Sequence, residues 1–245
     1  MNKFIISLSF IVLLSSIAFA EEVIVIDSND SNYPVGKKID ISSTAIKIAA
    51  TSALKLISQK GEIIKLNGPH DGIFNIPKNP EKENNKLFAA VAKLADTKEK
   101  DMRSMGMVRA SPPQAVADFH LLSIEGNSNQ CIIDLTKAKF FRQNSQEQIS
   151  VEITEEVNGS DANKKTAQKH TLEWEENNQY LSIPKNLNLQ DGHLYRIRVA
   201  GTNISKKITF HISNSNSTST NDKILEWLVE KGCTLQAESF LKNFY

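Results

Sequence analysis

The sequence predicts a mainly β protein, and this prediction comes from the spacing of apolar residues and turns. Short apolar segments rich in β-branched residues recur about every 8–12 residues, which is typical of small sheet modules. Clusters of Gly, Asn and Asp separate many of these segments and indicate turns. Helical periodicity appears mainly near the middle of the chain and at its end. We therefore expect two β-rich parts, a helical connection between them, and a terminal αα-hairpin.

The first 20 residues are typical of a secretory signal peptide. Lys3 supplies a positive start, Phe4–Leu14 is an apolar run interrupted only by serines, and Ala18–Ala20 places small residues before a cleavage site. We expect cleavage between Ala20 and Glu21. An uncleaved anchor helix is the alternative, but a membrane span needs about 20 apolar residues. The sequence thus predicts a periplasmic or secreted protein with no transmembrane segment after cleavage.

Charge limits the classes of partner. The 245 residues include 29 basic and 28 acidic side chains, and Lys3 is the only charged residue before position 21. A nucleic-acid binder needs a basic stripe, and electrostatic attachment to lipid needs a polybasic surface. The balanced charge argues against both, so we expect no nucleic-acid partner.

Residues 21–76 are expected to form a small β domain. Gln59–Glu62 is typical of a hairpin turn, whereas Asn67–Gly72 is expected to break the strand pattern. The candidate strands are Val23–Ile26, the segment around Ile39 and Ile41, Ile46–Ile48, Leu54–Ile57, Ile63–Leu66 and Ile73–Ile76.

Residues 77–117 are expected to be a linker that contains one helix. Prolines and charged residues dominate Pro77–Asn85. Apolar residues then recur at helical spacing between Leu87 and Leu94, which predicts a helix over residues 83–98.

Residues 118–212 are expected to form a β-sandwich-like domain. An immunoglobulin-like arrangement is one option, although the Cys…Trp…Cys spacing of true immunoglobulin domains is absent. The candidate strands are 119–124, 131–135, 138–142, 148–156, 169–174, 179–183, 194–200 and 206–212.

The end of the chain is expected to be helical. Residues 213–221 form a Ser/Asn/Thr-rich linker. Two helices should follow over residues 222–245, with Asp222 as an N-cap and Gly232 ending the first helix.

Cys131 and Cys233 are the only cysteines in the chain. In an oxidising compartment an even number of cysteines usually indicates a disulfide. This bridge would tie the C-terminal helices to a strand that begins at Cys131. Two free thiols or a reactive thiol are the alternatives, but no CxxC motif is present and no histidine lies near either cysteine in the sequence.

Residues 35–76 resemble the FecR-type β domain of exported bacterial proteins. The resemblance is carried by Val35-Gly36, by Ile46–Leu56 with its small-residue turn, and by Gly61–Pro69, a glycine turn and strand closed by Gly-Pro. The ending, from Trp227 to Ala237, resembles that of uncharacterised proteobacterial periplasmic proteins. The resemblance implies a related fold and residence in the cell envelope, and it implies no particular functional residue.

Possible chemical sites are sparse, and we expect no catalytic, cofactor-binding or metal-binding residues. His70-Asp71 follows Gly68-Pro69, so a polar turn is favoured over a metal or catalytic pair. Trp174 is expected in the sandwich core, although a tryptophan with glutamates beside it is also able to stack on a sugar. Glu155-Glu156 and Asp161 offer oxygen ligands for calcium, but their spacing favours a solvated hairpin.

The sequence therefore favours an exported, non-enzymatic envelope protein. It would act as an interaction or ligand-binding module with an envelope protein or a glycan as partner. Two alternatives stay open. One is a hydrolase of cell-wall glycan or peptide, and the other is an accessory of an envelope signalling system.

Overall fold

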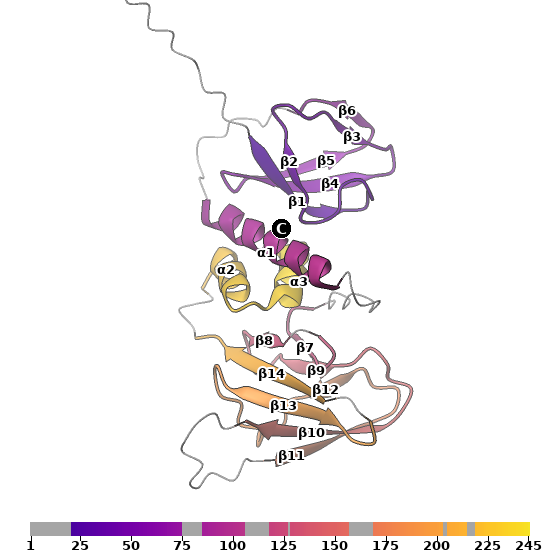
Figure 1. The fold of residues 1–245 in the computed structure, drawn as a ribbon, viewed down its shortest axis with the longest axis vertical. Helices are drawn as coiled ribbons and strands as arrows, with labels where there is room; N and C mark the ends of the chain where they lie inside the picture. Colours follow the sequence, from indigo (N-terminus) through magenta and orange to yellow (C-terminus); the bar gives the residue numbers. More distant parts are fainter. Residues whose placement is uncertain are drawn as a thin grey trace, which may run out of the picture.

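The computed structural model describes residues 21–74, 85–105, 118–126, 128–156, 169–202, 205–214 and 219–245. The fold is mainly β, as predicted. A β module, a layer of helices and a second β module follow one another along the long axis of the molecule (Figure 1). The expected signal peptide, residues 1–20, lies outside the described residues.

The first β module contains a four-stranded antiparallel sheet and a short two-stranded one. The larger sheet has the order β2-β1-β4-β5, and β3 pairs with β6 in the smaller. The strands are β1 Glu22–Ser28, β2 Lys38–Asp40, β3 Ile46–Ile48, β4 Ala53–Ser58, β5 Ile63–Asn67 and β6 His70–Gly72.

Strand β1 is buried on both faces, which explains its unbroken apolar run. Val23 and Val25 point into the core of the first β module. Ile24 and Ile26 point the other way and pack against the helices. The strand therefore lies between two cores.

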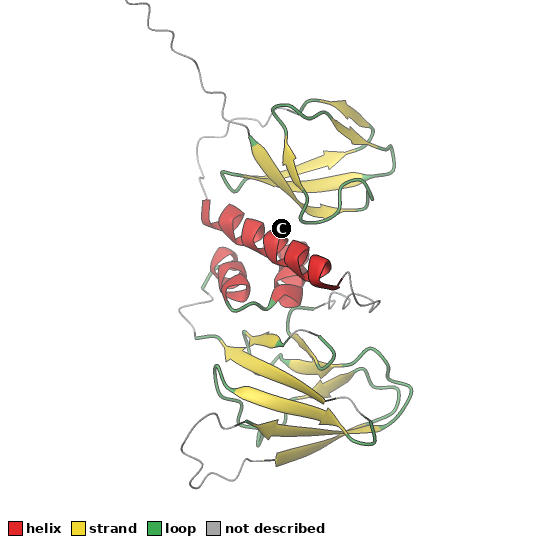
Figure 2. Cartoon of the chain, viewed as in Figure 1, coloured by secondary structure: helices red, strands yellow, loops and turns green. Residues whose placement is uncertain are grey.

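The helices form a layer between the two β modules (Figure 2). They are α1 Asn85–Met105, α2 Asn221–Glu230 and α3 Thr234–Phe244. Leu94 of α1, Leu228 of α2 and Phe240 of α3 share one apolar core. The helix expected within the linker is therefore present, and it is part of this packed layer.

The ends of the C-terminal helices agree only partly with prediction. Gly232 adopts a φ of 72° and ends α2, as expected. The N-cap of α2, however, is Thr220 rather than Asp222. Asp222 lies in the first turn, where its carboxylate accepts a hydrogen bond from the Tyr245 hydroxyl. Since this contact joins the start of α2 to the end of α3, it gives Asp222 a tertiary role.

The second β module contains two sheets around one core. Their orders are β11-β10-β13-β14-β8 and β12-β9-β7, and side chains from both sheets meet in this core, among them Phe140 and Phe210. The eight predicted strands are all present within a few residues of their expected bounds. They are β7 Leu121–Ser123, β8 Asn129–Ile132, β9 Lys139–Phe141, β10 Ile149–Glu155, β11 Lys169–Trp174, β12 Tyr180–Ser182, β13 Leu194–Val199 and β14 Ser205–Ile212.

A disulfide joins the helices to the second β module. Cys131 of β8 and Cys233, the N-cap of α3, are linked with an S–S distance of 2.10 Å. The side chain of Gln236 lies beside the bridge, accepting from the Cys131 N–H at 2.7 Å and donating to the Cys131 carbonyl at 2.7 Å. The predicted pairing is confirmed, although the strand begins at Asn129 rather than at Cys131.

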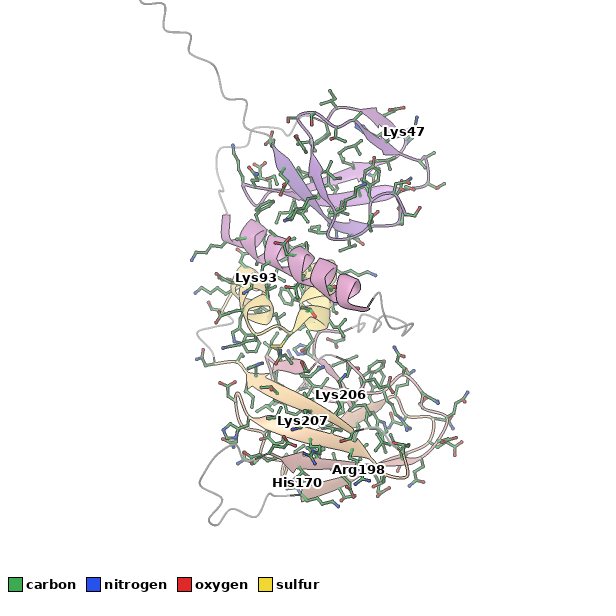
Figure 3. All side chains as sticks on the ribbon, viewed as in Figure 1. Lys47, Lys93, His170, Arg198, Lys206 and Lys207 are labelled. Atoms are coloured by element: carbon green, nitrogen blue, oxygen red, sulfur yellow. A yellow bond between two sulfur atoms is a disulfide. The ribbon has the colours of Figure 1, made fainter. Side chains whose placement is uncertain are left out.

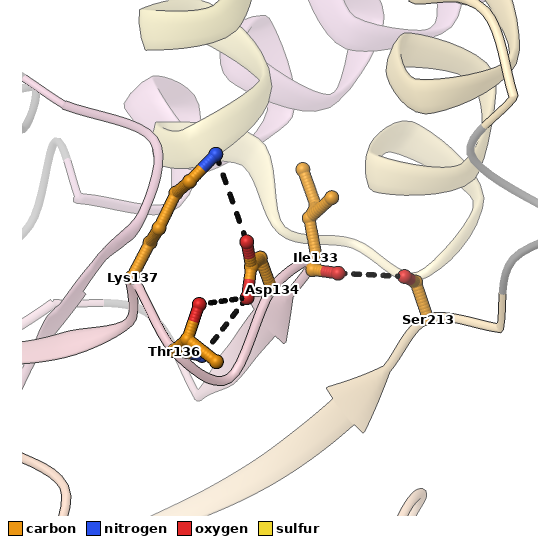
Figure 4. A network of polar contacts seen from close by, with 5 residues as sticks. All are labelled: Ile133, Asp134, Thr136, Lys137 and Ser213. Atoms are coloured by element: carbon orange, nitrogen blue, oxygen red, sulfur yellow. Dashed lines mark hydrogen bonds and ion pairs between the residues drawn. The ribbon is translucent and has the colours of Figure 1, made fainter.

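The chain that leaves β8 is held by a compact polar network (Figure 4). The Asp134 carboxylate accepts from the Thr136 N–H at 2.9 Å and from the Thr136 hydroxyl at 2.6 Å, and it lies 3.6 Å from Lys137 Nζ. The Ser213 hydroxyl, just after β14, donates to the Ile133 carbonyl at 3.1 Å. These contacts fix the turn next to the disulfide.

Candidate ligand-binding site

The first β module has a hollow of about 540 Å³ near β3 and β6. This volume falls within the range of roughly 300–1,000 Å³ that is usual for small-molecule sites. Lys47, which lines the hollow, lies at the end of the module that faces away from the helices (Figure 3). The lining residues are Asp30, Asn32, Lys47, Ile48, Ala49, Pro69, His70 and Asp71.

Strand β6 brings His70 and Asp71 into this hollow. The sequence predicted a break over Asn67–Gly72 and a strand from Ile73, but the strand is His70–Gly72 and neither Ile73 nor Phe74 belongs to it. The prediction was wrong because His, Asp and Gly have little intrinsic preference for strands. Antiparallel pairing with β3 holds these residues in a strand instead, with Lys47 opposite Asp71. The remaining predicted positions, 75 and 76, lie outside the described residues.

Gly68 permits this arrangement. A Cβ atom on Gly68 would lie 1.7 Å from the carbonyl oxygen of Ala49. The Gly68 N–H also donates to the Ser52 carbonyl at 2.8 Å. The chain before β6 therefore passes directly against the backbone around Ala49, and this contact positions Pro69 and His70.

A turn after β1 brings Asp30 to the same hollow. The Asp30 carboxylate accepts from the Asn32 N–H at 2.9 Å, and the Ser28 hydroxyl accepts from the Asp30 N–H at 2.9 Å. The Tyr33 hydroxyl accepts from the Lys47 N–H at 2.8 Å, which joins this turn to β3. Only 9% of Asp30 is exposed.

The charges at the hollow are unevenly placed. Lys47 Nζ and Asp71 Oδ2 form an ion pair at 3.1 Å, with side chains 78% and 67% exposed, so this pair lies at the rim. Asp30 is buried, and none of the described lysines, arginines or histidines forms an ion pair with it. Buried carboxylates in proteins are normally paired.

His70 adds a second incomplete interaction. Its Nε2 atom is buried and has no hydrogen-bond partner among the described residues. The ring contacts Phe74 edge to face, with centroids 6.3 Å apart. Leaving a buried polar atom without a partner costs about 1–3 kcal/mol.

The hollow combines acceptors, donors and apolar walls. Asp30, Asp71 and His70 offer acceptors, Lys47 and Asn32 offer donors, and Ile48 and Pro69 offer apolar walls. Within the described ranges, no group of three or more His, Cys, Asp and Glu side chains is suited to hold a metal ion. The predicted pair His70-Asp71 therefore lies in a polar hollow. Asp30 was missed because no sequence pattern links the turn after β1 to β6.

The other candidate sites have structural roles. Trp174 is fully buried in the core of the second β module, which confirms its predicted place and contradicts the sugar-stacking alternative. Glu156 pairs with Lys207 at 2.7 Å and with Arg196. Hydrogen bonds from Lys207 and Arg196 hold the pKa of Glu156 below its usual value, against the opposing effect of burial. Glu156 thus has cationic partners, and Asp161 lies outside the described residues.

Comparisons with family models, curated proteins and solved structures found no match for this chain. The resemblance of residues 35–76 to the FecR-type domain therefore stays a prediction. Among the residues that the structure places, no helix is both long and apolar enough to cross a membrane.

Proposed function

We propose that this protein is exported to the cell envelope and acts there as a ligand-binding module. The observation that carries the proposal is the hollow beside β3 and β6, which is lined by His70, a residue whose buried Nε2 atom has no partner among the described residues. Such a group is stabilised when a ligand completes its hydrogen bonding. The polar and apolar lining suits a small ligand or the end of a larger one.

The disulfide and the first 20 residues support the export part of the proposal. Disulfides persist in oxidising compartments and are rare in the cytosol. Cys131 and Cys233 are both almost fully buried, and their bridge crosses between two layers of the fold. To test export, the full chain would be expressed in a diderm host and its periplasm released by osmotic shock. We expect released protein without residues 1–20 and without alkylatable thiols, whereas retention in the cytosol with two free thiols would contradict export.

Binding would be tested on residues 21–245 by screening a library of small metabolites with amide-resolved NMR. We expect ligands that shift the amides of residues 30–32, 47–49 and 69–71. Ala49→Trp should abolish these shifts, because Ala49 lines the hollow and is exposed. Thr51→Trp is the matched control, since Thr51 is an exposed neighbour that does not line it. Ligands that still bind when Ala49 is replaced would contradict the proposed site.

The hydrolase alternative makes a different prediction in the same experiment. Glycosidases use two carboxylates, and Asp30 and Asp71 both line the hollow. A cell-wall fragment that is cleaved during the titration would give product signals. Stable, saturating shifts without product favour the binding module.

A further inference from the structure

The hollow in the first β module presents a specific kind of incomplete site. Two of its lining residues, Asp30 and His70, belong to segments far apart in the chain: the Asp30 carboxylate has no ion pair with a described residue, and the buried His70 Nε2 has no hydrogen-bond partner among them. An ionised carboxylate only accepts hydrogen bonds, and an imidazole with its proton on Nδ1 accepts through Nε2. The Asp30 carboxylate therefore suits a ligand that donates, and His70 suits one in the tautomer with its proton on Nδ1.

The cations nearby already have partners. Lys47 is the only lysine or arginine among the lining residues, and it pairs with Asp71 at the rim. Lys37 lies close to the Asp30 turn but donates to the Asn32 carbonyl at 2.7 Å and lies over the ring of Tyr33. Among the described residues, the Asp30 carboxylate thus has no cationic partner.

We propose that the hollow binds a primary ammonium group that is attached to a small apolar group such as an alkyl chain. This inference rests on the proposed ligand-binding function and names the class of ligand. The ammonium has three donors, and the Asp30 carboxylate, which lines the hollow beside His70, supplies an acceptor of opposite charge. Ile48, Ala49 and Pro69 supply the apolar contact for the attached group. An anionic ligand would meet Asp30 and Asp71 and only one lysine, so charge disfavours it.

Two sources share this chemistry, the amino terminus of a peptide and a simple alkylamine. Three probes separate them, titrated into residues 21–245 and followed by amide-resolved NMR. Leucinamide represents a peptide amino terminus, hexylamine represents an alkylamine, and N-acetylleucinamide lacks the ammonium group. We expect leucinamide or hexylamine to shift the amides around residues 30, 47 and 70, and N-acetylleucinamide to bind at least tenfold more weakly. The better of the first two probes identifies the source.

Asp30→Asn tests the carboxylate itself. The amide oxygen keeps an acceptor for the Asn32 N–H but removes the charge, and we expect at least tenfold weaker binding of the ammonium probe. Asp40→Asn is the matched control, because Asp40 accepts from the Ser42 N–H in the same kind of turn and does not line the hollow. It should leave binding within twofold, and thermal unfolding should show both variants folded.

The outcomes separate this inference from the proposed function. Equal binding of leucinamide and N-acetylleucinamide, or unchanged binding by Asp30→Asn, would overturn the ammonium inference. The same holds if none of the three probes binds. The binding function is judged independently, by whether any library ligand is lost in the Ala49→Trp variant and kept in the Thr51→Trp variant.

Discussion

Arg142 shows how one side chain holds two turns of the second β module together. Arg142 is only 2% exposed, and its guanidinium donates to the carbonyl oxygens of Glu147 and Glu175 at 2.7 Å and of Asn178 at 3.1 Å. It also lies 5.1 Å from the ring centroid of Trp174. The five donors of arginine match such a set of carbonyls, so the buried cation is satisfied without a carboxylate partner.

Replacing Arg142 with Met should therefore destabilise the protein strongly. Methionine would remove three partly buried hydrogen bonds from a charged donor, each worth about 1.5–3 kcal/mol, so we expect the free energy of unfolding to fall by about 3 kcal/mol or more. Urea denaturation would measure it. Arg198→Met, on the exposed face of β13, should change it by no more than about 0.5 kcal/mol. Equal midpoints for the two variants would contradict this role.

Gly68 should be the least replaceable glycine of the first β module. Alanine there would place a Cβ atom against the Ala49 backbone, and overpacking of this kind costs about 1–3 kcal/mol. Gly192→Ala is a useful comparison. Gly192 has a φ of 73°, and a Cβ atom there would meet no other atom within 4 Å, so alanine would cost only about 1 kcal/mol for its backbone conformation. We expect Gly68→Ala to be the more destabilising and also to shift the His70 imidazole resonances. If these resonances do not move, Gly68 does not position β6.

Among whole elements, β14 carries a histidine that links stability to pH. Burial lowers the pKa of His211, the charge of Lys231 lowers it further, and Asp191 opposes both. The folded state thus favours the neutral imidazole. The neutral His211 therefore adds to the free energy of unfolding when the pH is above the pKa of the unfolded state, near 6.5. This contribution is lost as the pH falls through the lower pKa of the folded state.

We therefore expect His211→Gln to flatten the dependence of unfolding free energy on pH between about 7.5 and 5.5. Burial also lowers the pKa of His120, so replacing His120 as well should flatten the pH dependence further. Below about pH 4.5 the variant should follow the unmodified protein, because hydrogen bonds and ion pairs lower the pKa values of Asp134, Glu152 and Glu156 in both. Urea midpoints across this range test the prediction, and an unaltered slope would refute it.

Elements with a local signal could be predicted from the sequence, and those made by distant contacts could not. Turn residues and alternation located the eight strands of the second β module. Strand β6 lacks both signals and depends on β3 and on the close approach at Gly68. For the same reason the sequence predicted a polar turn at His70-Asp71 where the structure has a strand, and the place of both residues beside Asp30 at the hollow depends on the fold.

For the whole molecule, the disulfide should make a large contribution to stability. Cys131 and Cys233 are 102 residues apart. Closing a loop of this length stabilises the folded state by about 4–5 kcal/mol in the chain-entropy estimate. We expect the melting temperature to fall when a reductant is added and in the Cys131→Ser/Cys233→Ser variant. A melting temperature that is insensitive to reductant would contradict this contribution.

The central core also joins the two ends of the described chain. Ile24 and Ile26, near its start, pack in one core with Phe240 and Leu241 of the last helix, and the C-terminus lies beside the first β module (Figure 1). Domains usually fold in order as they are synthesised, but here the core that α1 forms on one face of the first strand is completed only when the final residues arrive. The central core is therefore incomplete until α3 has been synthesised. A premature stop before α3 would likewise leave an apolar surface for quality-control proteases to recognise.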